Sequence, residues 1–518
     1  MADNPVSLVR RILSGDRELD QSRLLENVSR AAAGLSSRGI GAEDTVAIML
    51  RNDFPFFEAS MAASAVGAHA VPINWHFQAE ETGYILRDSG AKVLVVHADL
   101  LAQIEAGIPA GVQTFIVPTP PEIQAAYGIL PEQCATPRNL PEWGDWIGRF
   151  EPREMGAPPP PSSMIYTSGT TGNPKGVRRQ PHTAESAAKL AEMIAIAFGF
   201  GAGQDFRTVI TGPLYHAAPN LYGLWAAKSG GFCILQPRFD PEELLQLVER
   251  FRITHLHMVP TMFVRLLKLP EETKRKYDLS SLEFVVHAAA PCPPEIKRRM
   301  IEWWGPVVNE YYGATETGAV VFHTSEDALR KPGTVGRPIK GGTVRIYDDE
   351  GNALGPNVVG EVYARVEGFP DFTYNGLDEK RREIGRDGLV TVGDVGYLDE
   401  DGYLFLCDRK RDMVISGGVN IYPAELEAIL IALAGVHDCA VFGIPDEEYG
   451  EALCAYIEPE PGVELTADGV REYLSGKLAR YKLPKVIEFS HELPREDSGK
   501  IFKRKLRAPY WEQAGRQI

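Results

Sequence analysis

The 518-residue sequence has few cysteines and no pattern that would pair them. The six are scattered, with no CxxC pair and no metal-ligand spacing, which excludes a disulfide framework or a zinc site as an organising element. Long apolar runs are missing too. The most apolar segment, residues 59–73, contains Ala, Gly, His69 and a proline and is shorter than the ~20 residues of a membrane span, so we expect a buried helix and turn. The N-terminal residues lack the apolar core of a secretory signal, and we therefore predict a cytoplasmic protein without stable membrane insertion.

Positive charge is scarce as well. The chain carries 54 Lys and Arg against 70 Asp and Glu, a net charge of −16. Such a balance disfavours nonspecific attraction to nucleic acid or to an anionic membrane, so no nucleic-acid partner is expected. The length and the 44% hydrophobic composition allow a large core and more than one domain. These properties fit an enzyme acting on small molecules better than a protein that binds nucleic acid or a membrane.

Short apolar runs alternate with helical patterns through most of the chain. VAIML, KVLVV, TFIVP and EFVVHAA are typical of buried strands in α/β layers. From about residue 333, short strand candidates with Gly and Asp turns, such as GEVYARV, predict a small β-rich subdomain. After Arg409, a helix at PAELEAILIALAG with Pro423 in its first turn, two strands and a helix after Thr466 predict a compact α+β domain.

A glycine-rich loop, SGTTGNPKG at residues 168–176, follows a proline run at 156–163 that we interpret as a surface connector. Its glycines allow close backbone approach, its hydroxyls donate hydrogen bonds, and Lys175 adds a positive charge, all of which suit the phosphates of ATP. The loop does not fit GxxxxGK[ST], because Gly176 follows the lysine. A plain surface turn would explain the Gly and Pro residues but not the Thr-Thr pair and the lysine together.

Four further motifs accompany this loop. They are EYYGATE at 310–316, VGD at 392–394, DRKRDMVISGGVNIYPAELE at 408–427 and PREDSGK at 494–500. Together with YTSGTTGNPKG at 166–176, they resemble the adenylate-forming enzymes, the superfamily of acyl-CoA synthetases, peptide-synthetase adenylation domains and beetle luciferases. The motifs stand in the family's order and spacing, and the resemblance extends over nearly the whole chain.

The resemblance implies the fold and its division. The fold class is α/β, with a large N-terminal domain of stacked α/β subdomains plus a small β-barrel-like subdomain, and a small mobile α+β C-terminal domain. The implied boundaries are 1–408 for the N-terminal domain, 409–411 for a hinge and 412–518 for the C-terminal domain. Arg411 is the implied pivot, where the family more often has Asp or Lys.

The resemblance also implies two half-reactions. A carboxylate attacks the α-phosphate of ATP to give an acyl-adenylate and pyrophosphate, and a thiol, here coenzyme A, then displaces AMP. The implied catalytic residues are Lys500 for adenylation, Thr315 for a phosphate oxygen, Glu316 for Mg²⁺ and His216 in the acyl pocket. After rotation of the C-terminal domain, Gly417 and Gly418 would line the path of the CoA thiol.

The nucleotide site is implied residue by residue. Asp394 matches the ribose-binding aspartate, Arg409 would meet the sugar or the phosphate, and Tyr312 offers a ring for adenine. Val392 stands where the family usually has Thr, so one contact there is in doubt. The complete set of cofactor-binding residues expected is Thr167, Ser168, Gly169, Thr170, Thr171, Gly172, Lys175, Ala289, Ala290, Pro291, Glu310, Tyr311, Tyr312, Asp394, Arg409, Gly417 and Gly418.

The acid pocket is expected to be wide and apolar. Acetate-specific members of the family carry a tryptophan where this chain has Gly313, and several nearby residues are small or aliphatic. Medium- or long-chain fatty acids, aryl acids and bulky alicyclic acids remain open. The residues expected to line the pocket are His216, Asn220, Leu221, His287, Ala288 and Gly313. His255 and His257 share one face of a predicted strand, but no third ligand is evident, so metal binding there is not favoured.

Three other readings stay open beside an acyl-CoA synthetase. A ligase that loads a carrier protein has the same motifs but carries an inserted segment, and none is obvious here. A luciferase-like oxygenase is disfavoured because the motifs do not encode light emission. A regulatory nucleotide-binding pseudoenzyme would not require Lys500. The expected partners are therefore a small carboxylic acid and CoA, with a homodimer left open.

Overall fold

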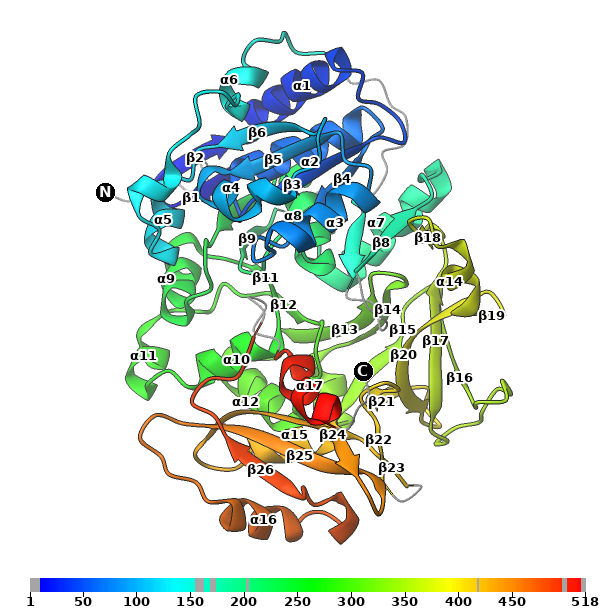
Figure 1. Ribbon diagram of the computed structural model, residues 1–518. Coiled ribbons are helices and arrows are strands. Elements are labelled where there is room, and N and C mark those ends of the chain that lie inside the picture. The colour runs from blue at the N-terminus through cyan, green and yellow to red at the C-terminus, as the bar shows by residue number, and fades with distance from the viewer. Residues whose placement is uncertain are drawn as a thin grey trace.

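The computed structural model describes residues 10–153, 163–167, 174–201, 205–416, 419–495 and 501–513. Figure 1 shows a large N-terminal part built around two stacked sheets, with a strongly twisted antiparallel region at one side and a small C-terminal domain beneath. The predicted α/β class, with a large N-terminal and a small C-terminal domain, is confirmed.

The first sheet is parallel and has the strand order β4-β3-β5-β6. Its strands fall on the apolar runs of the sequence: β3 (Thr45–Met49), β4 (His69–Pro72), β5 (Val93–His97) and β6 (Gln113–Val117). Both faces are buried, which explains why the runs do not alternate with polar residues. One face packs on helices α3 (Ala79–Asp88) and α4 (Ala98–Ile104), and the other on α1 (Gln21–Ser37), α2 (Phe54–Ala65) and α6 (Trp143–Ile147).

The second sheet is larger, and its strand β13 carries most of the EYYGATE motif. Its parallel part comprises β1 (Arg11–Ser14), β9 (Arg207–Ile210), β10 (Phe232–Leu235), β11 (His255–Met258), β12 (Phe284–His287) and β13 (Val308–Ala314). Helices α7 (Ala184–Phe198) and α8 (Ala217–Ser229) cover one face together with α1 and α2. Helices α9 (Pro241–Phe251), α10 (Pro260–Leu267) and α12 (Pro294–Trp304) cover the other. The two sheets therefore share a middle layer of helices.

The sheet continues into the predicted β-rich region. Beyond β14 (Gly318–His323), the antiparallel strands follow in the order β15-β21-β20-β17-β16. Their bounds are β15 (Thr334–Pro338), β16 (Gly342–Tyr347), β17 (Gly360–Val366), β20 (Leu389–Leu398) and β21 (Leu404–Arg409). A separate antiparallel sheet joins β7 (Ile165–Thr167), β8 (Lys175–Arg179) and β18 (Phe372–Tyr374).

The C-terminal domain has its own core around a long antiparallel hairpin. Its elements are β22 (Val414–Ser416), β23 (Val419–Ile421), α15 (Pro423–Ile431), β24 (Val436–Asp446), β25 (Gly450–Pro459), α16 (Ala467–Ser475), β26 (Val486–Phe489) and α17 (Lys503–Gln513). Pro423 opens α15 and Thr466 caps α16, as the sequence predicts. Lys268, at the end of α10, contacts this domain through its Nζ, 3.0 Å from the carbonyl oxygen of His437.

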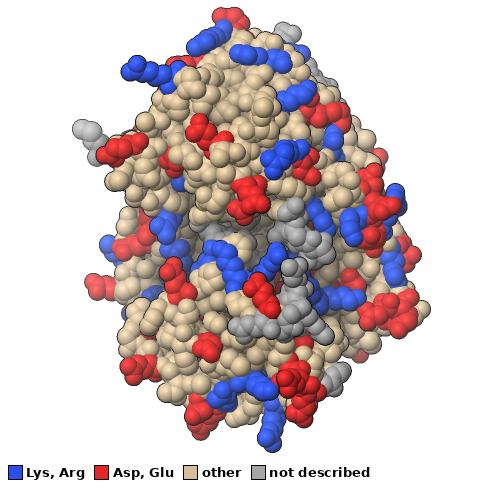
Figure 2. All heavy atoms as spheres, viewed as in Figure 1, with Lys and Arg blue, Asp and Glu red and all other residues tan. Residues whose placement is uncertain are grey.

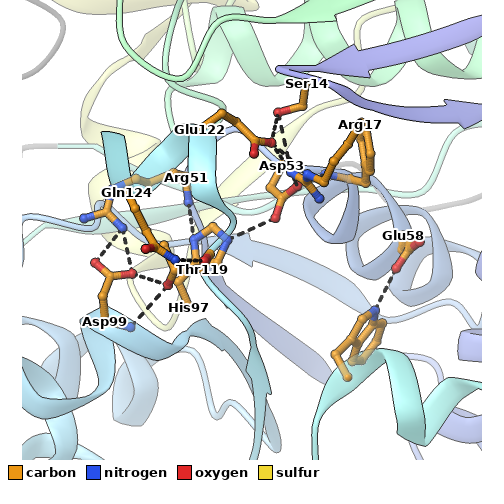
Figure 3. Close-up of polar contacts among 12 residues, drawn as sticks. Ser14, Arg17, Arg51, Asp53, Glu58, His97, Asp99, Thr119, Glu122 and Gln124 are labelled. Carbon is orange, nitrogen blue, oxygen red and sulfur yellow. Dashed lines mark hydrogen bonds and ion pairs between the residues drawn. The ribbon is translucent and has the colours of Figure 1, made fainter. Parts of the chain in front are cut away.

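A buried polar network fastens the N-terminal hairpin of β1 and β2 (Arg17–Asp20) to helix α2 (Figure 3). The carboxylate of Asp53, which caps α2, lies 2.6 Å from Arg17 Nη2 and 3.2 Å from His97 Nε2. Arg17 also pairs with Glu122 of α5 (Pro121–Tyr127). Since Nδ1 of His97 accepts the backbone amide of Arg51, the proton lies on Nε2 and is donated to Asp53. Asp53 thus links the hairpin, through Arg17, to the end of β5 in the first sheet, through His97.

Among the residues that the structure describes, no helix combines the length and the apolar character needed to cross a bilayer. The proline run at 156–163 lies almost entirely outside the described residues.

Candidate active site

The two strands that flank the glycine-rich loop form a hairpin. Thr167 at the end of β7 pairs with Lys175 at the start of β8. Ser168, Gly169, Thr170, Thr171 and Gly172 lie outside the described residues. The hairpin is anchored on one side by Tyr166, whose hydroxyl donates to Asp88 of α3 over 2.6 Å. Lys175 is thus carried by a β-strand and not by a free surface loop.

Tyr374 brings the lysine of this hairpin and the expected metal-binding glutamate together. Its hydroxyl donates to Oε1 of Glu316 over 2.9 Å, and Nζ of Lys175 lies 5.5 Å from the centre of its ring. Burial and the charge of Glu316 raise the pKa of Tyr374, so the hydroxyl keeps its proton and its donor role at neutral pH. Tyr374 is a site residue that no sequence motif marks, because its role comes from the pairing of β18 with β8.

Arg179 holds the backbone around Thr315. Its guanidinium donates to the carbonyl oxygens of Thr315 and Pro370, the latter over 2.9 Å. Burial lowers the pKa of Arg179 to about 10, while Glu316 opposes the shift, so the group remains charged at neutral pH. This buried cation fixes the turn that carries Thr315 and Glu316. Like Tyr374, Arg179 lies in none of the sequence motifs.

The expected ribose aspartate, the adenine tyrosine and the following arginine meet in one place. The hydroxyl of Tyr312 donates to Oδ2 of Asp394 over 2.7 Å, and Nε of Arg409 lies 3.3 Å from Oδ1 of Asp394. Asp394 and Arg409 face each other across β20 and β21. Arg411 follows in the turn after β21, where burial and the neighbouring Arg409 lower the pKa of its guanidinium.

The turn after β12 contains a strained residue. Ala289 has φ 73°, in the left-handed region that residues other than Gly rarely occupy. Such a conformation costs on the order of 1 kcal/mol and persists where the surroundings impose it, often at ligand sites. Ala290 and Pro291 follow directly, so the expected nucleotide-lining turn is the strained one.

The start of helix α8 is fixed by two asparagines. His216 occupies its N-cap position, next to the ring of Tyr215. The side-chain amide of Asn220 donates to the carbonyl oxygen of Leu214 over 2.9 Å. Asn52, just after β3, donates to Gly212 O and accepts from Leu214 N, each over 3.0 Å. The Asn220 side chain is thus held against the loop before His216, and its place in the acid pocket stays a prediction. Leu221 is half-buried on the same helix.

Strand alternation corrects two expectations. His287 is 0% exposed and lies on the α10 and α12 face of the sheet, where its ring contacts Phe263. The carboxylate of Glu310 lies on that face too, paired with Lys297 and 2.8 Å from His323 Nε2. His287 therefore does not line a pocket beneath α8. The Glu310 side chain serves a buried ion-pair cluster and is not available to a nucleotide.

The opposite face carries the other expected pocket residues. In the parallel register, His257 pairs with Val286 and Val286 with Asn309, so these three share one face, and Tyr311 follows Asn309 on it. Ala288, just after β12, packs in the same core cluster as Val286 and Tyr311, whereas a change of register between Tyr312 and Gly313 ends the regular alternation on β13. His255 and His257 share this face, as expected. His255 Nε2 lies 3.2 Å from Gly199 O, and His257 Nε2 lies 3.0 Å from the Tyr311 hydroxyl, so both atoms contact protein groups.

Part of the expected active site lies outside the described residues. Lys500, Gly417 and Gly418 lie outside them. The residues on either side of 496–500, Arg495 and Ile501, form an antiparallel bridge, and Arg495 is held by Glu458 over 2.7 Å. Figure 2 shows a hollow across the middle of the face between the N-terminal part and the C-terminal domain, bordered by several Lys and Arg side chains. Despite the net charge of −16, positive charge is therefore available around the hollow.

Comparison with known proteins agrees with this geometry. A family model described as AMP-binding enzyme matches residues 6–369, and one described as AMP-binding enzyme C-terminal domain matches residues 425–500. The chain belongs to this family of adenylate-forming enzymes. It is an AMP-forming acid–CoA ligase, and enzymes of this kind use ATP and CoA.

The relatives differ in the acid that their names state. An indoleacetate–CoA ligase of Aromatoleum aromaticum is 32% identical over 95% of this chain and 93% of its own length. A long-chain-fatty-acid–CoA ligase of Mycobacterium tuberculosis is 31% identical over 96% and 94%. The structure of o-succinylbenzoate CoA synthetase from Bacillus subtilis with its acyl-adenylate superposes with a TM-score of 0.78, at 26% identity over 97% of this chain and 96% of that one.

Replacing Tyr374 by phenylalanine tests the contact with Glu316. A hydrogen bond to a charged group is worth about 1.5–3 kcal/mol, so we expect kcat/KM for ATP to fall at least about ten-fold. Steady-state AMP formation at varied ATP and Mg²⁺ measures this. Tyr347→Phe is the matched control, because its hydroxyl donates to Asp387 over 2.6 Å in the same β-rich region. An equal loss in both variants would contradict the assignment.

Proposed function

We propose that the protein converts a hydrophobic carboxylic acid to its CoA thioester through an acyl-adenylate, with release of AMP and pyrophosphate. The single observation that carries this is the meeting of residues from four distant motifs. Lys175 lies over the ring of Tyr374 and Glu316 accepts its hydroxyl, while Tyr312 and Arg409 both contact Asp394. Cationic and carboxylate groups so arranged suit a magnesium-bound polyphosphate with a ribose at one end.

In this proposal each residue has a separate task. Asp394 accepts from ribose hydroxyls, and Lys175 with the hydroxyls of the glycine-rich loop binds phosphate oxygens. The carboxylate of Glu316 provides the kind of oxygen ligand that Mg²⁺ takes together with phosphate oxygens. When bound, the ion would neutralise charge on the phosphates. Lys500 would contact the attacking carboxylate and the α-phosphate.

The same proposal includes domain rotation. The C-terminal domain, residues 412–518, would turn about a hinge at 409–411 after adenylation. Asp408, just before the hinge, accepts the backbone amide of Ala424 at the start of α15 over 2.9 Å. This contact ties the end of β21 to the C-terminal domain. A charged pivot at Arg411 is compatible with exposure during rotation.

The test measures AMP release with ATP, Mg²⁺ and a panel of acids, each with and without CoA. CoA-dependent AMP together with a thioester product supports the proposal. Pyrophosphate exchange that CoA does not affect would instead favour a ligase that loads a carrier protein. An Asp394→Asn variant is the inactive control, because it removes the negative charge that pairs with Arg409 and that would accept from the ribose hydroxyls. Nucleotide binding without any turnover would favour a regulatory protein.

A further inference from the structure

Four aromatic side chains form a continuous layer where helices α7 and α8 pack on the second sheet. Phe198 of α7, Tyr222 of α8, His257 of β11 and Tyr311 of β13 have ring centres 5.2–5.9 Å apart in five of their pairings. We call these four residues the aromatic wall. All are buried, Tyr222 to 1% and Tyr311 to 8% exposure.

Polar atoms within the wall are paired with one another or with its neighbours. The His257 Nε2 and Tyr311 hydroxyl lie 3.0 Å apart, and the Tyr222 hydroxyl lies 2.7 Å from Thr208 Oγ1. Burial lowers the pKa of His257 to about 4, so its ring is neutral at physiological pH. Moving these side chains apart would break hydrogen bonds in a dry environment, which makes the wall a firm boundary.

The wall lies in line with the expected acid pocket. Tyr311 precedes Gly313 by two residues on β13, and it packs in the same core cluster as Ala288. The register of β13 with β14 changes between Tyr312 and Gly313, so regular alternation ends there. Two residues along a strand span about 7 Å. An acid whose carboxylate reaches the nucleotide and whose body enters past Gly313 would therefore meet the Tyr311 ring within roughly one ring's length. A long alkyl chain continues well beyond that distance.

We propose that the aromatic wall closes the acid pocket, so that the enzyme selects compact acids bearing an aromatic ring and rejects long-chain fatty acids. This inference rests on the proposed ligase function and narrows its acid. Ring edges and faces from four elements offer the edge-to-face and offset contacts that an aromatic substrate prefers. An extended alkyl chain gains nothing comparable and finds its path blocked.

The first test compares kcat/KM for phenylacetate, 4-hydroxycinnamate, decanoate and hexadecanoate in CoA-dependent AMP formation. The wild type should favour one of the aryl acids over both fatty acids by at least about a hundred-fold. Tyr311→Ala should open the wall and raise the decanoate-to-aryl ratio at least about ten-fold. Tyr311→Phe is the matched control, because it keeps the ring and should keep the chain-length preference. Phe198→Ala opens the wall from another element if Tyr311→Ala does not fold.

A binding measurement separates failure of this inference from failure of the ligase proposal. Sulfamoyl-adenosine analogues carrying phenylacetyl or dodecanoyl groups are titrated calorimetrically into the full chain, without turnover. Tight binding of the phenylacetyl analogue alone supports the wall. Tighter binding of the dodecanoyl analogue, or a wild type that prefers decanoate or hexadecanoate, would contradict closure of the pocket by the aromatic wall. Either result would leave the proposed ligase function standing. Binding of neither analogue together with no AMP from any acid overturns both.

Discussion

Replacing Lys500 by alanine is expected to reduce acyl-adenylate formation by about two to three orders of magnitude and to leave thioester formation from preformed acyl-adenylate nearly unchanged. The reason is electrostatic. In adenylation an anionic carboxylate approaches the anionic α-phosphate, and an ammonium group between them stabilises the charge that develops. In the second half-reaction the thiol attacks an acyl-adenylate, and the resemblance assigns that step to another face of the C-terminal domain.

Two assays separate the half-reactions. Pyrophosphate exchange reports adenylation, and AMP release from synthetic acyl-adenylate with CoA reports thioester formation. Lys505→Ala is the matched control, since Lys505 is an exposed lysine in the same C-terminal segment. Equal losses in both assays for Lys500→Ala would show that the lysine supports the domain's structure and not adenylation. The bridge between Arg495 and Ile501 lies outside the substituted position and should persist.

Replacing Lys297 by methionine is expected to lower the free energy of unfolding by about 3 kcal/mol. Lys297 and Glu310 are 5% and 4% exposed, and the methionine would leave a buried carboxylate without its cation. Burial opposes ionisation of Glu310, but Lys297 and the nearby histidines outweigh it and hold the pKa of Glu310 below its usual range.

The sign of the pH dependence follows from this pairing. In the wild type, the depressed pKa of Glu310 contributes stability above the ordinary carboxyl range near ~4.3, and this contribution is lost as pH falls through the folded-state value. Without Lys297, burial dominates and the pKa of Glu310 rises. Acidification then protonates the buried group, so the gap in unfolding free energy between wild type and variant should narrow below neutral pH.

Denaturant unfolding at several pH values measures this gap. Lys297→Met with Glu310→Gln should recover part of the loss, because the unpaired charge disappears. Arg298→Met, at the next position of α12, is the control. It pairs with the exposed Glu295 and Glu302, and its replacement should change stability little. A loss in Lys297→Met that does not depend on pH would point to packing and not to charge.

The sequence predicts most of the fold because the strands of the first sheet are buried on both faces. VAIML, KVLVV and TFIVP become β3, β5 and β6 since a fully buried strand must be apolar throughout. Local signals also hold where one residue type is required, as with Pro423 at the start of α15. These predictions depend on neighbours in the sequence, and tertiary contacts do not override them.

The candidate site is less predictable because several of its contacts join residues far apart in sequence. Tyr374 reaches Glu316 only because β18 pairs with β8, and Asn52 reaches the loop before α8 only because the two sheets share a helical layer. The errors have a related cause. His287 and Glu310 belong to strands that carry predicted site residues, but alternation turns their side chains to the other face. The roles of Lys500, Gly417 and Gly418 remain predictions from the sequence.

The N-terminal hairpin of β1 and β2 has a consequence for the order of folding. Ile12 pairs with Cys233 and Leu13 with Ile234. The hairpin of β1 and β2 can form locally, but it cannot join the second sheet until more than two hundred later residues have been synthesised. A closure over so long a separation is slow and follows local structure. During synthesis the first sheet can form early, whereas residues 11–20 must wait for β10. Docking of this hairpin, completed by Arg17 and Asp53, would then be among the last steps in assembling the N-terminal domain.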